Sequence, residues 1–184
     1  MKKIALGLIG FGTIGTGVVR LLQENRDLIS QRVGAEIHLK RIADIDIVRS
    51  RGIVIDRARL TTDAADILND PEIDIVIELM GGYEPARSFI LQALKNKKHV
   101  VTANKALLAT HGDEIFQSAL REGVNIGFEA SVGGTIPVIK TIKESLVANR
   151  IQSIYAILNG TSNFILSKMT DEGKSFAAVL KEAQ

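Results

Sequence analysis

The feature that most constrains this chain is a short apolar stretch followed at once by three spaced glycines. Residues 3–9 predict a strand buried on both faces, because apolar residues fill most of it. The glycines belong to a six-residue run of Gly10, Phe11, Gly12, Thr13, Ile14 and Gly15, after which a helix is predicted. In such a run the first glycine permits a tight turn, the second lets the backbone approach a pyrophosphate, and the third lets helix and strand pack closely. The run therefore predicts a dinucleotide-binding βαβ unit that binds NAD or NADP.

Further strands and helices alternate behind this unit. Apolar stretches predict strands over residues 36–43, 73–79, 99–102 and 124–128. Helices are predicted from Pro85 onward and around residues 113–122, where apolar positions recur with helical spacing. Strands that alternate with helices predict an α/β fold with a doubly wound parallel sheet of the Rossmann type.

The pattern changes after Phe128. Residues 131–135 predict a loop, and Pro137 opens a helix whose Val138, Ile139, Ile142 and Leu146 should face inward. A strand is predicted over residues 151–158, and residues 159–163 predict a turn that caps a helix over residues 164–170. The last helix begins at Ser175 as N-cap and reaches Gln184 without a glycine, a proline or a C-cap. This uncapped helix predicts that the chain is a fragment.

Composition excludes several classes of protein. The formal net charge is only +2 and the basic residues are dispersed, which gives no case for a nucleic acid or a membrane as partner. Apolar runs stay below the roughly 20 residues of a membrane helix, and the start lacks a signal peptide's cleavage region, so a cytoplasmic protein is expected. The chain has no cysteine, which rules out a disulfide, a thiolate metal site and aldehyde oxidation through an enzyme thioester.

An acidic residue ends the second predicted strand. Asp44 stands where such folds bind the adenosine ribose, although the usual gap of about 20 residues after the glycines is exceeded here. A carboxylate at this position favours NAD, because it repels a 2′-phosphate. Arg41, Arg49 and Arg51 lie close in sequence and would offset that charge, so the choice between NAD and NADP stays open.

Three further motifs follow the carboxyl ends of predicted strands, where doubly wound folds place their ligands. They occupy residues 78–86 (ELMGGYEPA), 102–109 (TANKALLA) and 128–137 (FEASVGGTIP). Together with residues 10–15 and 159–166 (NGTSNFIL), they closely resemble homoserine dehydrogenase, in order and over essentially the whole chain. That family reduces aspartate β-semialdehyde to homoserine with NAD(P)H, on the route to threonine, methionine and isoleucine.

The resemblance assigns roles to particular residues. It implies that Lys105 contacts the cofactor and the active site, where an ammonium group stabilises negative charge that grows on a carbonyl oxygen. It places Gly81 and Gly82 beside the nicotinamide end of the cofactor. It further implies a sodium ion, held mostly through main-chain oxygens by Glu129, Val132, Gly134 and Ile136. Many relatives have glycine at the position of Thr135, so this loop is expected to differ slightly.

The resemblance also divides the chain. It implies an NAD(P)-binding domain over residues 1–128 and the beginning of a substrate and dimerisation domain over residues 129–184, through which the family forms homodimers. The family's substrate-binding acids and second lysine lie beyond Gln184, so this polypeptide is expected to bind cofactor but to reduce semialdehyde poorly. Two alternatives stay open: a non-catalytic dinucleotide-binding module or sensor, and another oxidoreductase with the same cofactor domain.

Overall fold

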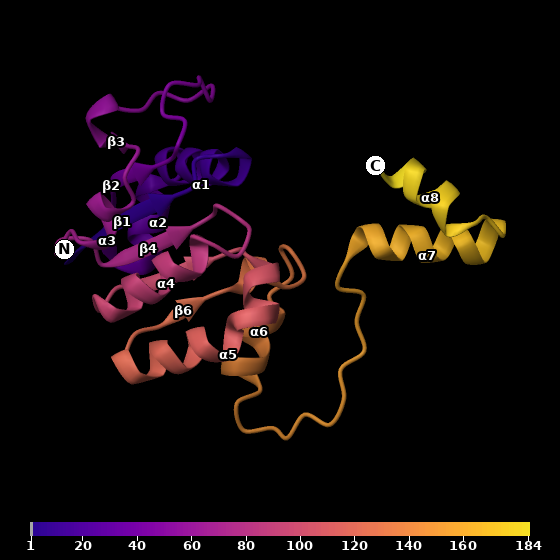
Figure 1. The fold of residues 1–184 in the computed structure, drawn as a ribbon. Coiled ribbons are helices and arrows are strands. Elements are labelled where there is room, and N and C mark those ends of the chain that lie inside the picture. The colour runs from indigo at the N-terminus through magenta and orange to yellow at the C-terminus, as the bar shows by residue number, and fades with distance from the viewer. Residues whose placement is uncertain (1) are drawn as a thin grey trace. The chain divides into compact units, whose positions relative to one another are not determined.

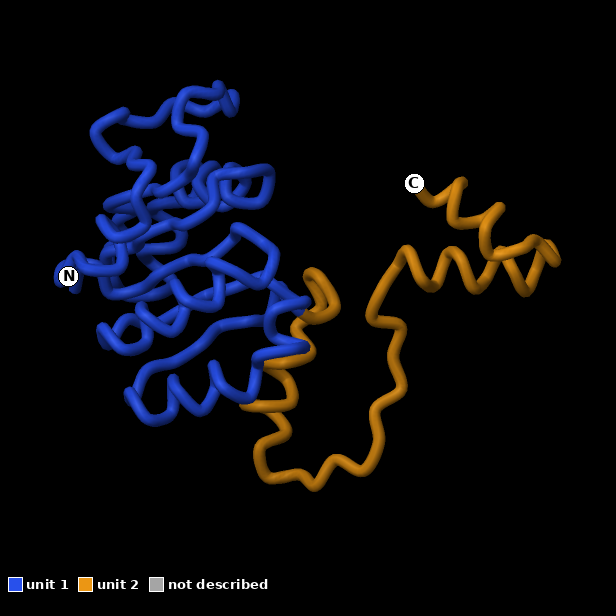
Figure 2. The backbone as a smooth tube through the Cα atoms, in the orientation of Figure 1, with its two compact units in different colours: residues 1–131 blue, residues 132–184 orange. Residues whose placement is uncertain are grey.

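The structure is a computed structural model that describes residues 2–184 (Figure 1). It divides into two compact units, Met1–Ser131 and Val132–Gln184, which Figure 2 shows in different colours. Within residues 2–184, every helix is too short or too polar to cross a membrane.

A parallel sheet of six strands forms the centre of the first unit. The strands are β1 (Lys2–Ile9), β2 (Ala35–Ala43), β3 (Leu60–Thr61), β4 (Ile75–Glu78), β5 (His99–Thr102) and β6 (Ile126–Gly127). Their order across the sheet is β3-β2-β1-β4-β5-β6, and every neighbouring pair is parallel. The predicted doubly wound sheet is therefore confirmed. The strand order reverses between β1 and β4, and such folds bind ligands beyond the carboxyl ends of the strands at this point.

Helices cover both faces of the sheet. They are α1 (Thr13–Glu24), α2 (Arg26–Val33), α3 (Ala65–Leu68), α4 (Ala86–Lys95) and α5 (Lys105–Glu122), with 3-10 turns η1 (Arg57–Arg59) and η2 (Glu129–Ser131). Successive strand residues point to opposite faces. Leu8 accordingly joins an apolar cluster with Val19 of α1, whereas Ile9 joins the cluster that contains Ile90 of α4 and Ile115 of α5. Burial on both faces explains why the strands are apolar almost throughout.

Several predicted boundaries in this unit were wrong. The helix expected around residues 113–122 begins at Lys105, because the Asn104 side chain caps it by accepting a hydrogen bond from the Leu107 N–H at 3.2 Å. The first helix, which the sequence predicts to end near residues 26–30, ends at Glu24 with Asn25 as its C-cap, and α2 follows as a separate helix. The strand expected over residues 124–128 pairs only through Ile126 and Gly127. The short elements β3, α3 and η1 were not predicted.

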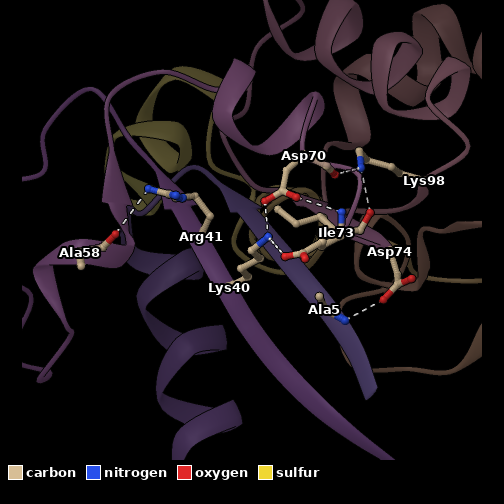
Figure 3. Close-up of polar contacts among 9 residues, drawn as sticks. Ala5, Lys40, Arg41, Ala58, Asp70, Ile73, Asp74 and Lys98 are labelled. Carbon is tan, nitrogen blue, oxygen red and sulfur yellow. Dashed lines mark hydrogen bonds and ion pairs between the residues drawn. The ribbon is translucent and has the colours of Figure 1, made fainter. Parts of the chain in front are cut away.

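A cluster of polar contacts fastens the amino-terminal end of β4 (Figure 3). Lys98 is buried just before β5, and its ammonium group donates to the main-chain oxygens of Asp70 and of Ile73, the latter at 2.8 Å. Burial lowers the pKa of Lys98. Lys40 of β2 forms an ion pair with the Asp70 carboxylate at 2.6 Å, and Asp74 accepts from the main chain of β1 at 2.8 Å. The cluster therefore joins β1, β2, β4 and β5 at the end of the sheet opposite the glycine-rich turn.

The second unit is helical. It contains α6 (Val138–Lys140), the π-helical turn η3 (Thr141–Ser145), α7 (Gly160–Glu172) and α8 (Phe176–Ala183). The helix predicted from Pro137 is present, but Val138, Ile139 and Ile142 are only partly buried and Leu146 lies beyond its end. Ser175 caps α8 as predicted, because its side chain accepts a hydrogen bond from the Ala178 N–H.

Two predictions for this unit were wrong. Residues 151–158 adopt neither strand nor helix, and Tyr155 is 94% exposed. A strand exists only by pairing with another strand, and all six strands of residues 2–184 belong to the first unit. The helix expected over residues 164–170 is longer, since Asn159 accepts from the Ser162 N–H at 2.8 Å and α7 starts at Gly160.

Candidate functional site

The glycine-rich turn follows β1 at the point where the strand order reverses. Gly10 has a φ of +98°, and its N–H donates to the carbonyl oxygen of Ala43 at 2.9 Å. A Cβ on Gly10 would lie 2.6 Å from the carbonyl carbon of Leu79. Both the positive φ and the close approach of the chain after β4 therefore require glycine here.

The other two glycines of the turn differ in their surroundings. A Cβ on Gly15 would lie 2.1 Å from the carbonyl oxygen of Gly10, so Gly15 lets α1 pack against the turn. A Cβ on Gly12 would meet no atom within 4 Å. Gly12 is the N-cap residue of α1, and no side chain caps that helix. The first N–H groups of α1 are therefore available to a ligand, and an anion is favoured at this end of a helix.

Two clefts lie beside this turn. One, of about 450 Å³, is lined by residues that include Gly10, Ile45, Ala64, Met80 and Phe89. The other, of about 610 Å³, has three arginines among its lining residues. Gly12, Asp44 and Ile45 line both clefts. Volumes of this size suit a nucleotide, and the shared lining residues show that the two clefts adjoin each other at the glycine-rich turn.

Asp44 is engaged by the main chain of its own surroundings. Its carboxylate accepts hydrogen bonds from the N–H of Phe11 at 2.5 Å and from the N–H of Asp46 at 2.8 Å. Arg51 lies 3.4 Å from the same carboxylate. Asp44 therefore lies beside the glycine-rich turn at the end of β2, and its charge is balanced by Arg51. The sequence identified Arg51 only as a neighbour in the chain.

Glu78 organises the second glycine turn. The side chain is fully buried at the end of β4, where its carboxylate accepts from the Met80 N–H at 2.8 Å and from the Gly81 N–H at 3.4 Å. It also accepts from the Thr102 hydroxyl of β5 at 2.7 Å. The carboxylate thus holds the turn that contains Gly81 and Gly82, both with positive φ, against the neighbouring strand. Sequence reasoning gave Glu78 no role, because its partners become visible only once β4 and β5 are paired.

Lys105 stands at the start of α5, next to this turn. The Asn104 side chain donates to the carbonyl oxygen of Gly82 at 2.7 Å and caps α5 through the Leu107 N–H. Asn104 therefore fixes the first residue of α5 relative to Gly82, and the Lys105 side chain is exposed there. Its exposed position leaves the ammonium group accessible to a ligand. Sequence reasoning missed Asn104, although an asparagine directly before a run of helix formers is a sequence signal for an N-cap.

The four residues of the expected sodium site fall in different units. Glu129 begins η2 in the first unit, whereas Val132, Gly134 and Ile136 belong to the second. Gly133 and Gly134 have φ values of +69° and +64°. Among residues 2–184, no three histidine, aspartate or glutamate side chains gather into a metal-binding group, so a cation here would depend on main-chain oxygens.

Comparisons with known proteins agree with the geometry of the turn. Residues 10–129 match the family model described as homoserine dehydrogenase, NAD binding domain, and residues 137–184 match the model described as homoserine dehydrogenase. The chain is 44% identical to the homoserine dehydrogenase of Bacillus subtilis over 184 residues, which is 100% of this chain and 42% of that protein. It is 49% identical to the enzyme of Synechocystis, covering 98% of this chain and 41% of that protein.

Solved structures lead to the same family. A homoserine dehydrogenase structure from Thiobacillus denitrificans is 50% identical, with a TM-score of 0.89, and covers 100% of this chain and 42% of that chain. A hyperthermophilic archaeal homoserine dehydrogenase solved in complex with NADPH is 23% identical with a TM-score of 0.78, a likeness in fold alone that covers 98% of this chain and 60% of that chain. This chain therefore spans about 42% of the length of the bacterial relatives described. Because the family model for the NAD-binding domain matches most of this chain, the chain belongs to the homoserine dehydrogenase family and carries the NAD(P)-binding domain of that family.

Proposed function

We propose that this chain forms the cofactor-binding part of a homoserine dehydrogenase, an enzyme that uses NAD(P)H to reduce L-aspartate 4-semialdehyde to L-homoserine. The observation that carries the proposal is the open space above Gly12 at the uncapped N-terminus of α1, where the strand order reverses. A pyrophosphate fits there because free N–H groups and the helix dipole both favour an anion. We assign residues 1–128 to cofactor binding and residues 129–184 to the beginning of a substrate and dimerisation domain.

The chemistry of the proposed reaction gives this chain's residues distinct tasks. When bound, the reduced nicotinamide supplies the hydride. Lys105 would place its ammonium group near the carbonyl oxygen that becomes negative as the hydride is transferred, which lowers the barrier. Gly81 and Gly82 would lie beside the nicotinamide end of the cofactor, in the turn that Glu78 holds. Glu78 is a positioning residue in this proposal, because it is buried beneath the turn.

Substitution of Gly12 by valine tests the proposal. The valine side chain would occupy the open space in which the pyrophosphate is proposed to lie, and NADH and NADPH should both bind on the order of 100-fold more weakly, the equivalent of two lost charge-assisted hydrogen bonds. The fold should be retained, since Gly12 has an ordinary φ of −75° and no atom lies near its Cβ position. Fluorescence titration with each nucleotide measures the affinity, and circular dichroism measures the fold.

A matched control is Gly160→Val. Gly160 also has open space at its Cβ position, but it lies in the second unit. This variant should bind both nucleotides like the wild type. If Gly12→Val binds both nucleotides as tightly as the wild type does, the placement of the pyrophosphate is refuted. If the wild type binds neither NADH nor NADPH, the proposed function is refuted.

The proposal includes a sodium ion at Glu129, Val132, Gly134 and Ile136, a homodimer, and a cytoplasmic location. Main-chain carbonyl oxygens are good ligands for a hard cation, and the positive φ values of Gly133 and Gly134 turn the main chain sharply within this segment. Sodium should therefore raise the melting temperature relative to choline at equal ionic strength, since a ligand that binds the folded state stabilises it. Gly134→Ala, which strains this turn, should abolish the difference. Equal melting temperatures of the wild type in both salts would argue against the ion.

A further inference from the structure

The larger cleft beside the phosphate turn lies on the side of the loop that follows β2. It has a volume of about 610 Å³ and is bordered by α1 and by residues 44–51. Its polar lining includes Thr16 and Arg20 of α1 and Arg49, Ser50 and Arg51 of the loop. Three guanidinium groups around one cleft indicate an anionic ligand.

The carboxylate of Asp44, which lies at the edge of this cleft, is already engaged and therefore does not repel an anionic ligand. Both oxygens of Asp44 accept hydrogen bonds from main-chain N–H groups, those of Phe11 and Asp46, and Arg51 compensates the charge. Asp46 is also engaged, because it accepts from the N–H groups of Val48 at 3.2 Å and Arg49 at 3.0 Å. These two hydrogen bonds, from the Arg49 N–H and then from the Val48 N–H, hold the pKa of Asp46 below its usual value. The two carboxylates thus stabilise the loop.

Arg51 and Arg41 are occupied by structural contacts. The Arg51 guanidinium donates to the carbonyl oxygens of Phe11, Asp46 and Arg49, and it stacks over the Phe11 ring with its central carbon 4.5 Å from the ring centroid. Only 10% of the Arg51 side chain is exposed, so it is a positioning residue. Arg41 donates to the carbonyl oxygen of Ala58, as Figure 3 shows, and is not part of the cleft lining.

Arg20 and Arg49 are the cations that remain for a ligand. Both side chains line the cleft, both residues are exposed, and neither forms an ion pair with any residue between 2 and 184. Arg20 comes from α1 and Arg49 from the loop, and Thr16 and Ser50 are further lining residues that carry hydroxyl groups. Two guanidinium groups and hydroxyl donors match a phosphate monoester, which carries between one and two negative charges and accepts several hydrogen bonds.

We propose that this cleft is the subsite for a phosphate on the adenosine ribose, held by Arg20 and Arg49, so that the chain prefers the 2′-phosphorylated dinucleotide NADP(H). The inference rests on the proposed function, because it needs the pyrophosphate at Gly12. Gly12 and Asp44 line both clefts, so a ribose that follows the pyrophosphate lies beside Asp44 and next to the arginines. The Asp44–Arg51 pair removes the repulsion that would otherwise select NAD.

Parallel titrations with NADPH and NADH test this inference. The wild type should bind NADPH at least about tenfold more tightly, the value of one charge-assisted hydrogen bond to phosphate. Arg49→Ala should weaken NADPH about tenfold and leave NADH within about twofold, and Arg20→Ala with Arg49→Ala should abolish the preference. Adenosine 2′,5′-bisphosphate should likewise compete better than AMP against the wild type but not against the double variant.

Arg32→Ala is the matched control. Arg32 is an exposed arginine of α2 outside the cleft, so its loss changes the net charge equally without touching the subsite. Equal wild-type affinities for NADPH and NADH, or an Arg49→Ala effect no larger than that of Arg32→Ala, would overturn the inference and leave the proposed function intact. Failure of the wild type to bind either nucleotide would overturn both.

Discussion

Gly15→Ala is expected to lower the free energy of unfolding of the first unit by about 3 kcal/mol or more, the upper range for overpacking a rigid site. The new Cβ would lie 2.1 Å from the carbonyl oxygen of Gly10 and 3.1 Å from its carbonyl carbon. Both atoms are backbone, in a turn already fixed by the Gly10–Ala43 hydrogen bond, so no side chain can move aside. Urea denaturation followed by circular dichroism measures the loss.

The control for this variant lies two residues further along the same helix. A Cβ on Gly17 would meet no atom within 4 Å, so Gly17→Ala should raise the stability by up to about 1 kcal/mol, because alanine is the better helix former. The two substitutions are chemically identical and should change the stability in opposite directions. A Gly15→Ala protein as stable as the wild type would contradict the described approach of α1 to the turn.

Glu78→Leu is expected to cost about 3 kcal/mol and to weaken nucleotide binding. Leucine is similar in size, but it leaves the N–H groups of Met80 and Gly81 and the Thr102 hydroxyl without their acceptor. Each buried donor left unsatisfied costs about 1–3 kcal/mol, although relaxation toward solvent reduces the sum. The turn with Gly81 and Gly82 would then shift, so calorimetry and NADPH titration should both register the change.

Glu72→Leu serves as the matched control. Its side chain is 77% exposed and forms a surface ion pair with Lys40, so the same substitution should change stability by about 1 kcal/mol at most. The stability of Glu78→Gln should lie between those of the two leucine variants. The amide keeps one acceptor oxygen, but its NH2 group faces groups that also donate hydrogen bonds. Equal stabilities of Glu78→Leu and Glu72→Leu would show that the buried carboxylate does not hold the turn.

Much of the first unit could be predicted from sequence because its signals are local. The strand His99–Thr102 was predicted to the residue, and the glycine pattern correctly anticipated tight packing at Gly15 and open space at Gly12. Apolar residues in a strand buried on both faces leave little ambiguity. Both the doubly wound sheet and the family followed from several such signals in the same order.

The remaining features depend on partners that sequence does not place. The partners of Glu78 come from its own turn and from β5, and Arg51 packs on the Phe11 ring 40 residues away. The strand predicted over residues 151–158 was wrong for the same reason, since β-forming residues need a paired neighbour. Periodicity alone predicts which residues prefer to be buried, and the fold decides whether a partner is there.

The loop after β2 has a consequence for how cofactor preference can change over evolution. Ile45, Val48 and Val54 are 96%, 85% and 91% exposed, so much of this loop contributes little to the apolar core. Arg49 and Ser50 lie on the same stretch. Mutations can therefore accumulate at these positions with little loss of stability, and selection can retune nucleotide choice there while the glycine turn and the sheet stay unchanged.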